Sequence, residues 1–384
     1  MNIRFISMLI AIIFLSLNIN ITVYAEDDIN AKAYVLMEAS TGKVIKESNQ
    51  DEKLVPASIT KIMTILLIYE AISEGKIKLT DSVTVSEHAA SMGGSQVFLE
   101  AYEIQTVADM LKCIVVASAN DASVAMGEHI AGSETAFVEM MNKRAEELGM
   151  KNTHFENACG LDADNHYTSA MDVAIMSREL VTKYPEIHDI TKIWQDSIIH
   201  KTRKGEKEFV LTNTNKLIKW YQYANGLKTG STSKALYCVS GTAEKDGIKF
   251  IAVIMAAPDY KQRFREAAKL FDYGFANFKV VKGKVKNEKV GSIKVIGGKE
   301  DEADVLVGKD VSFVVGKGDK TEMKTEINME KEIIAPAKAK TKVGEIIYKL
   351  GGNKIGKADL IIESDIYKAG FKDVLRKILR KYYL

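Results

Sequence analysis

The chain has little cysteine and little histidine, and its charge is nearly balanced. Its 384 residues include three cysteines and six histidines, and the formal net charge is +2. An odd number of cysteines at irregular spacings predicts neither a disulfide framework nor a cysteine-based metal site. The histidines show no His-x-x-x-His pairing, so the sequence indicates no metal site. A net charge this close to zero gives no argument for a nucleic-acid partner.

Long apolar runs are also scarce, and the clearest one lies at the N-terminus. Arg4 precedes an apolar-rich run from Phe5 to Leu17, and Val23-Tyr24-Ala25 ends in a small residue. This pattern predicts a secretory signal peptide over residues 1–25, cleaved after Ala25. The alternative is an uncleaved membrane anchor, which the polar Asn18 and Asn20 disfavour. In both cases the rest of the chain would lie outside the cytoplasm.

What the chain does contain is enough apolar sequence, 46% of its residues, for a sizeable core and two domains. The N-terminal part has expected strands at both ends and helices between. Early and late strands could pair in one sheet and thereby bring residues near 228 beside the helix at 62–72. The expected strands are 33–37, 44–46, 81–86, 236–243 and 248–256, and the expected helices are 62–72, 107–117, 120–131, 135–148, 171–182 and 263–278. Residues 183–224 carry no clear pattern.

One motif, Ser58-Ile59-Thr60-Lys61, opens the helix expected at 62–72, which Gly75 would end. Apolar residues surround this helix almost completely, which predicts a buried central helix. Residues three apart share a helical face, so the Ser58 hydroxyl and the Lys61 amine would be neighbours. Burial lowers the pKa of a lysine amine, and a neutral amine can take the proton of a serine hydroxyl. The motif is therefore a candidate for a serine nucleophile, with helix N-terminal N–H groups available to an oxyanion.

Ser-x-x-Lys is a common spacing, and it also occurs at Ser40, Ser73 and Ser231. The competing interpretation of Ser58 and Lys61 is a capping serine beside a lysine that extends its amine to solvent.

Two further motifs follow. Ser118-Ala119-Asn120 lies in a tight link between two apolar helices, where the hydroxyl could relay a proton and the amide could hold a substrate amide. The alternative role is helix capping. Lys228-Thr229-Gly230 could bind a carboxylate at a strand edge, with Gly230 allowing close approach of substrate backbone. In isolation this tripeptide is better explained as an exposed turn.

The composition changes near residue 279, where lysine, valine and glycine become frequent. Short apolar runs between Gly- and Lys-rich turns predict a small β domain over about 284–362. The stretch 365–384 is different again. It is predicted to be an amphipathic helix with Tyr367 and Phe371 on its apolar face and basic residues around the other. Such a helix fits the surface of an anionic membrane, the alternative being a helix that packs on the β domain.

Taken together, the three motifs resemble those of the penicillin-recognising serine acyl enzymes in order and spacing. Their contexts, and nearly the whole mature chain, resemble the D-alanyl-D-alanine carboxypeptidases, the low-molecular-mass penicillin-binding proteins. The matching contexts are residues 56–64, 118–123, 160–172 and 226–232. The resemblance implies an α+β fold: a penicillin-binding/β-lactamase-like domain, built as an antiparallel sheet with a helical region, then a small all-β domain and an amphipathic helix. The expected domains are a signal peptide (1–25), a catalytic domain (26–278), a β-rich domain (279–364) and a membrane-anchor helix (365–384).

The resemblance also implies a function. The expected reaction is removal of the terminal D-alanine from peptidoglycan stem pentapeptides, without a metal or organic cofactor, and with acylation by β-lactams. The expected location is the outer face of the cytoplasmic membrane, where the C-terminal helix holds the protein. Carried over by position, Ser58 is the acylated nucleophile, Lys61 its general base and Ser118 a proton relay. The expected substrate-binding residues are Asn120, Lys228, Thr229, Gly230, Ser231, whose N–H would complete an oxyanion hole with that of Ser58, and Arg263.

Two alternatives remain. A β-lactamase of class A would carry a glutamate that activates the deacylating water. The loop 156–168 lacks a Glu-x-x-x-Asn arrangement, because position 160 is glycine, and the two C-terminal additions also disfavour this alternative. The second is a catalytically silent, membrane-bound peptidoglycan-binding protein, which the intact motifs disfavour.

Overall fold

The computed structural model describes residues 29–202, 205–319 and 322–382. The predicted signal peptide, residues 1–25, lies outside these ranges. The elements described below all belong to the unit that begins at Ala31.

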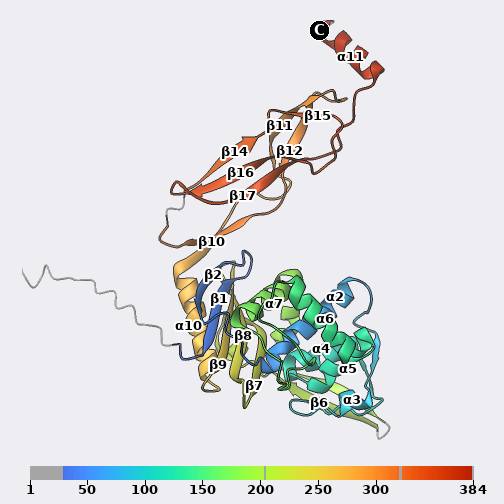
Figure 1. Cartoon of the computed structure of the whole chain (residues 1–384), viewed down its shortest axis with the longest axis vertical. Helices are drawn as coiled ribbons and strands as arrows, with labels where there is room; N and C mark the ends of the chain where they lie inside the picture. The colour runs from blue at the N-terminus through green and yellow to red at the C-terminus, as the bar shows by residue number, and fades with distance from the viewer. Residues whose placement is uncertain (1–28, 203–204, 320–321, 383–384) are drawn as a thin grey trace, which may run out of the picture. The chain divides into compact units, whose positions relative to one another are not determined.

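A five-stranded antiparallel sheet forms the centre of the N-terminal part (Figure 1). Its order is β2 (Val44–Ser48), β1 (Ala33–Glu38), β9 (Ile248–Ala257), β8 (Leu236–Lys245) and β7 (Ala224–Thr232). The first strands of the chain therefore pair with late strands, as the sequence predicts: Val35 on β1 lies opposite Val253 on β9. Because β7 is the last strand in this order, one of its edges is left open to a ligand.

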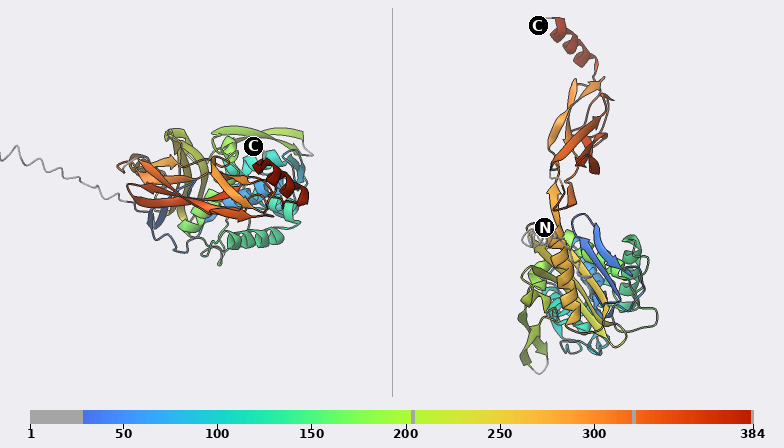
Figure 2. Two further views of the ribbon diagram at one scale, coloured as in Figure 1. Left: turned by 90° about the horizontal axis from the view of Figure 1, so that it is seen from above. Right: turned by 90° about the vertical axis from the view of Figure 1, so that its left-hand side faces the viewer.

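Strand β9 has buried apolar side chains on both faces of the sheet, and helices cover both faces. Ile251, Val253 and Met255 join the main apolar core with the helical region. Since side chains alternate across a strand, Phe250 faces the other way, and its ring contacts Phe275 of α10 (Gln262–Asn277), 5.2 Å between centroids. Helix α10 covers this second face of the sheet (Figure 2).

The helical region lies against the opposite face of the sheet. It is centred on α2 (Lys61–Ser73), in which ten of thirteen side chains are buried, so the prediction of a buried central helix is confirmed. The region also contains η1 (Ala57–Thr60), α3 (Glu87–Ala90), α4 (Val107–Lys112), η2 (Cys113–Ala117), α5 (Asn120–Ala131), α6 (Glu134–Glu147), α7 (Ala170–Lys183), α8 (Ile187–Thr191) and α9 (Leu217–Trp220). The helices predicted at 120–131, 135–148 and 171–182 are confirmed within two residues at each end. The helix predicted at 107–117 is split, because it changes from α4 to a π-helical turn, η2.

Two small antiparallel pairs complete this part of the chain. They are β3 (Ser82–Thr84) with β4 (Ile104–Thr106), and β5 (Gln195–Thr202) with β6 (Gly205–Thr212). The hairpin of β5 and β6 lies within residues 183–224, where the sequence shows no clear pattern.

The predicted small β domain is also present. Strand β10 (Phe278–Lys282) pairs with β13 (Ser312–Gly316). A six-stranded sheet follows in the order β14 (Met323–Met329), β16 (Lys342–Leu350), β17 (Asn353–Ile362), β12 (Glu302–Val307), β11 (Lys289–Ile296) and β15 (Glu332–Ile334). It has its own apolar core, which includes Val305, Ile346, Tyr348 and Leu360. The expected α+β fold class is thus confirmed.

The C-terminal helix is shorter than predicted. Helix α11 spans Phe371–Tyr382, whereas Ile366 and Lys368 form bridges with Ala337 and Gly298 of the β domain. The placement of Tyr367 on the helical face was therefore wrong, because residues 366–369 form backbone hydrogen bonds with the β domain. Within the described residues, none of the helices has the length and apolar content that crossing a membrane requires.

Candidate active site

Ser58 lies in the short turn η1, directly before the central helix α2. Ala57, which precedes it, has φ of +47°, a left-handed conformation that is uncommon outside glycine. Strand β7 crosses this turn at Gly230, where a Cβ atom would lie only 2.9 Å from the backbone nitrogen of Ser58. A side chain at position 230 would push the strand away, so glycine allows the sheet edge to lie directly against the serine.

Lys61 begins α2, and its amine contacts three acceptor groups in the protein interior. Its Nζ lies 3.0 Å from Ser58 Oγ, 2.6 Å from Asn120 Oδ1 and 2.6 Å from the Cys159 carbonyl oxygen. The side chain is fully buried. The serine and lysine that the sequence placed on one helical face are therefore within hydrogen-bonding distance.

These three contacts fix the direction of the amine. The Asn120 amide oxygen and the Cys159 carbonyl can only accept hydrogen bonds. A neutral amine has two N–H groups and one lone pair, so the N–H groups satisfy these acceptors and the lone pair is left to face the Ser58 hydroxyl. Burial lowers the pKa of Lys61 to about 8, which brings the neutral form into the physiological range. The geometry therefore suits removal of the serine proton.

Ser118 and Asn120 face the same site from the link between η2 and α5. Ser118 has φ of +62°, which ends the π-helical turn and points the chain toward α5. Lys228 Nζ donates a hydrogen bond to Ser118 Oγ at 2.8 Å. Asn120 Nδ2 donates to the Gly93 carbonyl at 2.7 Å, so its amide joins Lys61 to the loop that contains Gly93. Burial, followed by the charges of Lys61 and Arg263, lowers the pKa of Lys228 well below its ordinary value.

A cavity of about 190 Å³ opens beside Ser58 and Ser118. At the wall of this cavity, Thr229 Oγ1 donates a hydrogen bond of 2.8 Å to Thr214 Oγ1. Arg263 of α10 reaches it as well: its guanidinium donates to the Gly230 carbonyl at 3.0 Å, and it lies 4.7 Å from the Tyr260 ring centre. The cavity is lined by Ser58, Ser95, Ser118, Thr214, Thr229, Gly230, Ser231, Tyr260 and Arg263.

The structure thus brings together all nine residues that the sequence selected. Lys61, Asn120 and Lys228 are held by the contacts above, and the other six line the cavity. The sequence did not indicate Cys159, which contributes a backbone carbonyl, nor Thr214, which lies in the segment without a clear pattern. Ser95 and Tyr260 were missed as well. A carbonyl gives no residue-type signal, since every residue has one.

The loop with the Cys159 carbonyl packs tightly on the Ser58 turn. Gly160 has φ of +87°, and a Cβ atom there would lie 1.9 Å from the Ala57 carbonyl oxygen. Asn157 Oδ1 accepts hydrogen bonds from the N–H groups of Cys159 and Gly160, at 3.2 and 2.7 Å. Thr64 of α2 donates to the Ala158 carbonyl at 2.6 Å. The loop is thereby fixed against the helix that holds Lys61.

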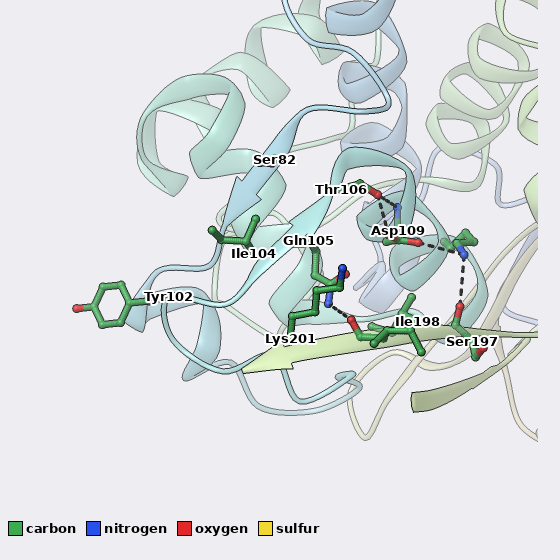
Figure 3. A pocket seen from close by; sticks show the side chains of 11 residues that line it. Ser82, Tyr102, Ile104, Gln105, Thr106, Asp109, Ser197, Ile198 and Lys201 are labelled. Carbon is green, nitrogen blue, oxygen red and sulfur yellow. Dashed lines mark hydrogen bonds and ion pairs between the residues drawn. The ribbon is translucent and has the colours of Figure 1, made fainter. Parts of the chain in front are cut away.

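A second pocket, of about 670 Å³, lies between β4 and β5 (Figure 3). Side chains bridge its two walls: Gln105 donates to the Ile199 carbonyl at 2.8 Å, and Lys112 to the Ser197 carbonyl at 3.3 Å. Its described lining contains none of the predicted site residues.

A central antiparallel sheet, a buried helix that begins with a Ser-x-x-Lys motif, and a lysine on the facing sheet edge define the class of penicillin-binding, β-lactamase-like serine hydrolases. The chain belongs to the D-alanyl-D-alanine carboxypeptidase family, because the family model of that description matches residues 20–259. A second model, described as the C-terminal domain of penicillin-binding protein 5, matches residues 278–368. The sequence-based family assignment and the assignment as a serine-type D-Ala-D-Ala carboxypeptidase are both confirmed.

Named relatives agree with this assignment. The chain is 44% identical over 350 residues to the D-alanyl-D-alanine carboxypeptidase DacF of Bacillus subtilis, covering 91% of this chain and 89% of the relative. It is similar to the crystal structure of penicillin-binding protein 5 from Haemophilus influenzae, with a TM-score of 0.77 and 33% identity over 88% of this chain and 98% of that one. Penicillin-binding protein D2 of Listeria monocytogenes in its ampicillin-bound form has a TM-score of 0.53 and 30% identity, over 64% of this chain and 97% of that one.

Proposed function

We propose that this carboxypeptidase removes the terminal D-alanine of peptidoglycan stem pentapeptides through an acyl-enzyme on Ser58. The observation that carries the proposal is the Lys61 amine, 3.0 Å from Ser58 Oγ and restrained by two groups that only accept hydrogen bonds. An activated hydroxyl next to a cavity with carboxylate-binding side chains suits acyl transfer from a substrate that ends in a carboxylate.

In the proposed first half-reaction, the Ser58 oxygen attacks the carbonyl between the two D-alanines while Lys61 Nζ takes the hydroxyl proton. The resulting oxyanion would be held by the backbone N–H groups of Ser58 and Ser231. Lys228 and Thr229 would bind the terminal carboxylate, supported by Arg263, and Asn120 the substrate amide. Bringing a carboxylate to the buried Lys228 amine would favour its charged form, since an opposite charge raises the pKa of a lysine.

The leaving D-alanine needs a proton on its amine. Ser118 is suited to relay to it the proton that Lys61 took from Ser58, a transfer that returns Lys61 to its neutral form. The Ser118 hydroxyl lies 2.8 Å from Lys228 Nζ and lines the cavity next to Ser58. Water then attacks the Ser58 ester, Lys61 takes the proton of that water, and Ser58 regains its hydroxyl proton as the shortened peptide leaves.

We also propose that β-lactams acylate Ser58, since the related Listeria protein has been crystallised in an ampicillin-bound form. A β-lactam presents a strained amide and a carboxylate, which would occupy the same cavity as the D-alanyl-D-alanine end.

The proposed location is the outer face of the cytoplasmic membrane, after export and removal of residues 1–25. Two features of α11 support attachment to anionic lipid. Its apolar side chains are exposed, Phe371 at 84%, with Val374, Leu375, Ile378 and Leu379 each near one half. Basic residues occupy most of its other positions, beside the acidic Asp373: Lys372, Arg376, Lys377, Arg380 and Lys381.

The test of the proposed reaction is release of D-alanine from a synthetic pentapeptide ending in D-Ala-D-Ala, measured beside hydrolysis of benzylpenicillin. The expected result is catalytic D-alanine release with slow turnover of the penicillin. Fast penicillin hydrolysis without D-alanine release would indicate a β-lactamase. Absence of both reactions in folded protein would indicate a silent binding protein.

A further inference from the structure

His166 is a buried histidine next to the site to which the proposed mechanism gives no role. Its side chain is 2% exposed and lies in the segment between the Cys159 loop and α7. One ring nitrogen, Nε2, is 2.8 Å from Thr60 Oγ1, and the other, Nδ1, accepts the backbone N–H of Glu156 at 3.3 Å. Because Nδ1 accepts, the ring proton is on Nε2, and the ring donates to Thr60. Burial lowers the pKa of His166 to about 4, so the ring is neutral at physiological pH.

The two partners of His166 belong to the two segments that set the environment of the catalytic lysine. Thr60 is the neighbour of Lys61 in the chain, in the turn that also holds Ser58. Glu156 begins the loop whose Cys159 carbonyl accepts the hydrogen bond from Lys61 Nζ. The imidazole therefore joins the turn to the loop, and its edge-on contact with Phe155, 5.8 Å between ring centres, fixes its orientation.

We propose that His166 is a positioning residue for Lys61. By tying Thr60 to the 156–161 loop, it holds the Cys159 carbonyl where it takes one N–H of the amine, which leaves the lone pair directed at Ser58. Loss of the tie would let the loop shift, and the amine would then rotate away from the serine. The inference rests on the proposed function, in which Lys61 is the general base.

Displacements of about 1 Å in a catalytic group can lower a rate on the order of 100-fold. The effect should fall on the chemical step. Lys228 and Thr229, which are expected to bind the substrate carboxylate, lie on β7. The hydrogen bonds described for their side chains go to groups other than His166.

Three substitutions separate the two hydrogen bonds. His166→Gln keeps a donor at the position of ring Nε2 and so preserves the link to Thr60. His166→Asn keeps an acceptor near the position of Nδ1 and preserves only the link to Glu156. His166→Leu removes both. His129→Gln, in the last turn of α5, is the matched control.

The measurement is kcat and KM for D-alanine release, with the fraction of active enzyme counted by a long incubation with fluorescent penicillin. We expect kcat to fall on the order of 10- to 100-fold in His166→Leu and His166→Asn with KM within about twofold of wild type, and His166→Gln to recover most of the loss. The control should match wild type.

Three results would overturn the inference: wild-type kcat in all three variants, equal losses in the Gln and Asn variants, or a loss confined to KM. If His166→Leu does not fold, the Gln and Asn pair still decides the question. A wild-type enzyme that releases no D-alanine would instead refute the proposed function.

Discussion

At the scale of single residues, the proposed reaction depends on Lys61. A lysine that is fully buried and not paired with a carboxylate is costly, because burial removes the hydration of its charge. The structure offsets this cost with polar acceptors, Asn120 Oδ1 and the Cys159 carbonyl, which bind the amine in either protonation state. The result is an amine that loses its proton more readily than an exposed lysine does.

This property predicts the pH dependence of acylation. Only neutral Lys61 can take the Ser58 proton, and burial lowers its pKa to about 8. The neutral fraction rises about tenfold per pH unit well below this pKa and levels off above it. We therefore expect the acylation rate constant with a fluorescent penicillin to rise from pH 6 to about 8 and then reach a plateau. A rate that is constant or decreases over this range would contradict Lys61 as the base.

The residues of the candidate site differ in how far the sequence could predict them. Ser58, Lys61 and Lys228 belong to motifs whose chemistry depends on side-chain type, so spacing and resemblance were sufficient to select them. Cys159 acts through its backbone, and Thr214 follows a hairpin that has weak apolar periodicity. Such positions can be identified as site residues only from the structure, in which the fold brings them to the cavity.

At the scale of elements, the closest packing near the site is between the Cys159 loop and η1. Gly160 is the contact point, and it combines a left-handed φ of +87° with a 1.9 Å approach of a Cβ atom to the Ala57 carbonyl. Gly149, in the link after α6, has a similar φ of +75° but open space around it. Alanine substitutions at these two glycines therefore distinguish the cost of a left-handed backbone, which both share, from the cost of a steric clash, which only Gly160 has.

We predict that Gly160→Ala lowers the free energy of unfolding by about 3–5 kcal/mol and greatly slows acylation, because the loop must move off the serine turn. Gly149→Ala should cost about 1–2 kcal/mol, the strain of a left-handed alanine, and leave acylation unchanged. Chemical denaturation and penicillin labelling measure both quantities. Equal losses of stability in the two variants would show that the loop does not pack as described.

The proposed attachment of α11 to a membrane surface gives the second prediction at this scale. Ile366 belongs to the core of the β domain, so a deletion that tests the anchor should begin at Phe371 rather than at Asp365. We predict that removing residues 371–384 abolishes binding to vesicles of anionic lipid and leaves D-alanine release from a soluble peptide unchanged.

A point variant supports the same test. Leu375→Asp places a carboxylate on the exposed apolar face of α11 and should weaken vesicle binding, whereas Lys372→Gln, the matched control, should weaken it far less. Vesicle sedimentation measures all three proteins. If the protein that lacks residues 371–384 bound the vesicles as well as the full chain does, the membrane attachment would lie outside α11.

The sequence predicted element types best where the apolar pattern was long. Helices α5, α6 and α7 show the helical period over 12 to 14 residues, and their bounds were close to those observed. The C-terminal helix was extended too far, because Tyr367 fits the helical apolar face although its neighbours pair with the β domain. Backbone pairing with distant strands overrides local periodicity and is not visible in the segment itself.

At the scale of the whole molecule, the fold places the motifs by joining the two ends of the catalytic part. Strand β1 pairs with β9, and β8 then pairs with β7, which lies at the edge of the sheet. Residues 58, 118 and 228 are thereby brought to one cavity although up to 170 positions separate them in the chain. The sequence pattern alone could only suggest that early and late strands share a sheet. The resemblance to a known family implied the fold in which they do.

The role of Ser58 as the nucleophile is best tested by the mass of the intact protein after incubation with benzylpenicillin, followed by peptide mapping. We predict one penicilloyl adduct, located on Ser58, and no adduct in a folded Ser58→Ala variant. An adduct at another residue, or none in folded wild-type protein, would contradict the assignment of Ser58 as the nucleophile.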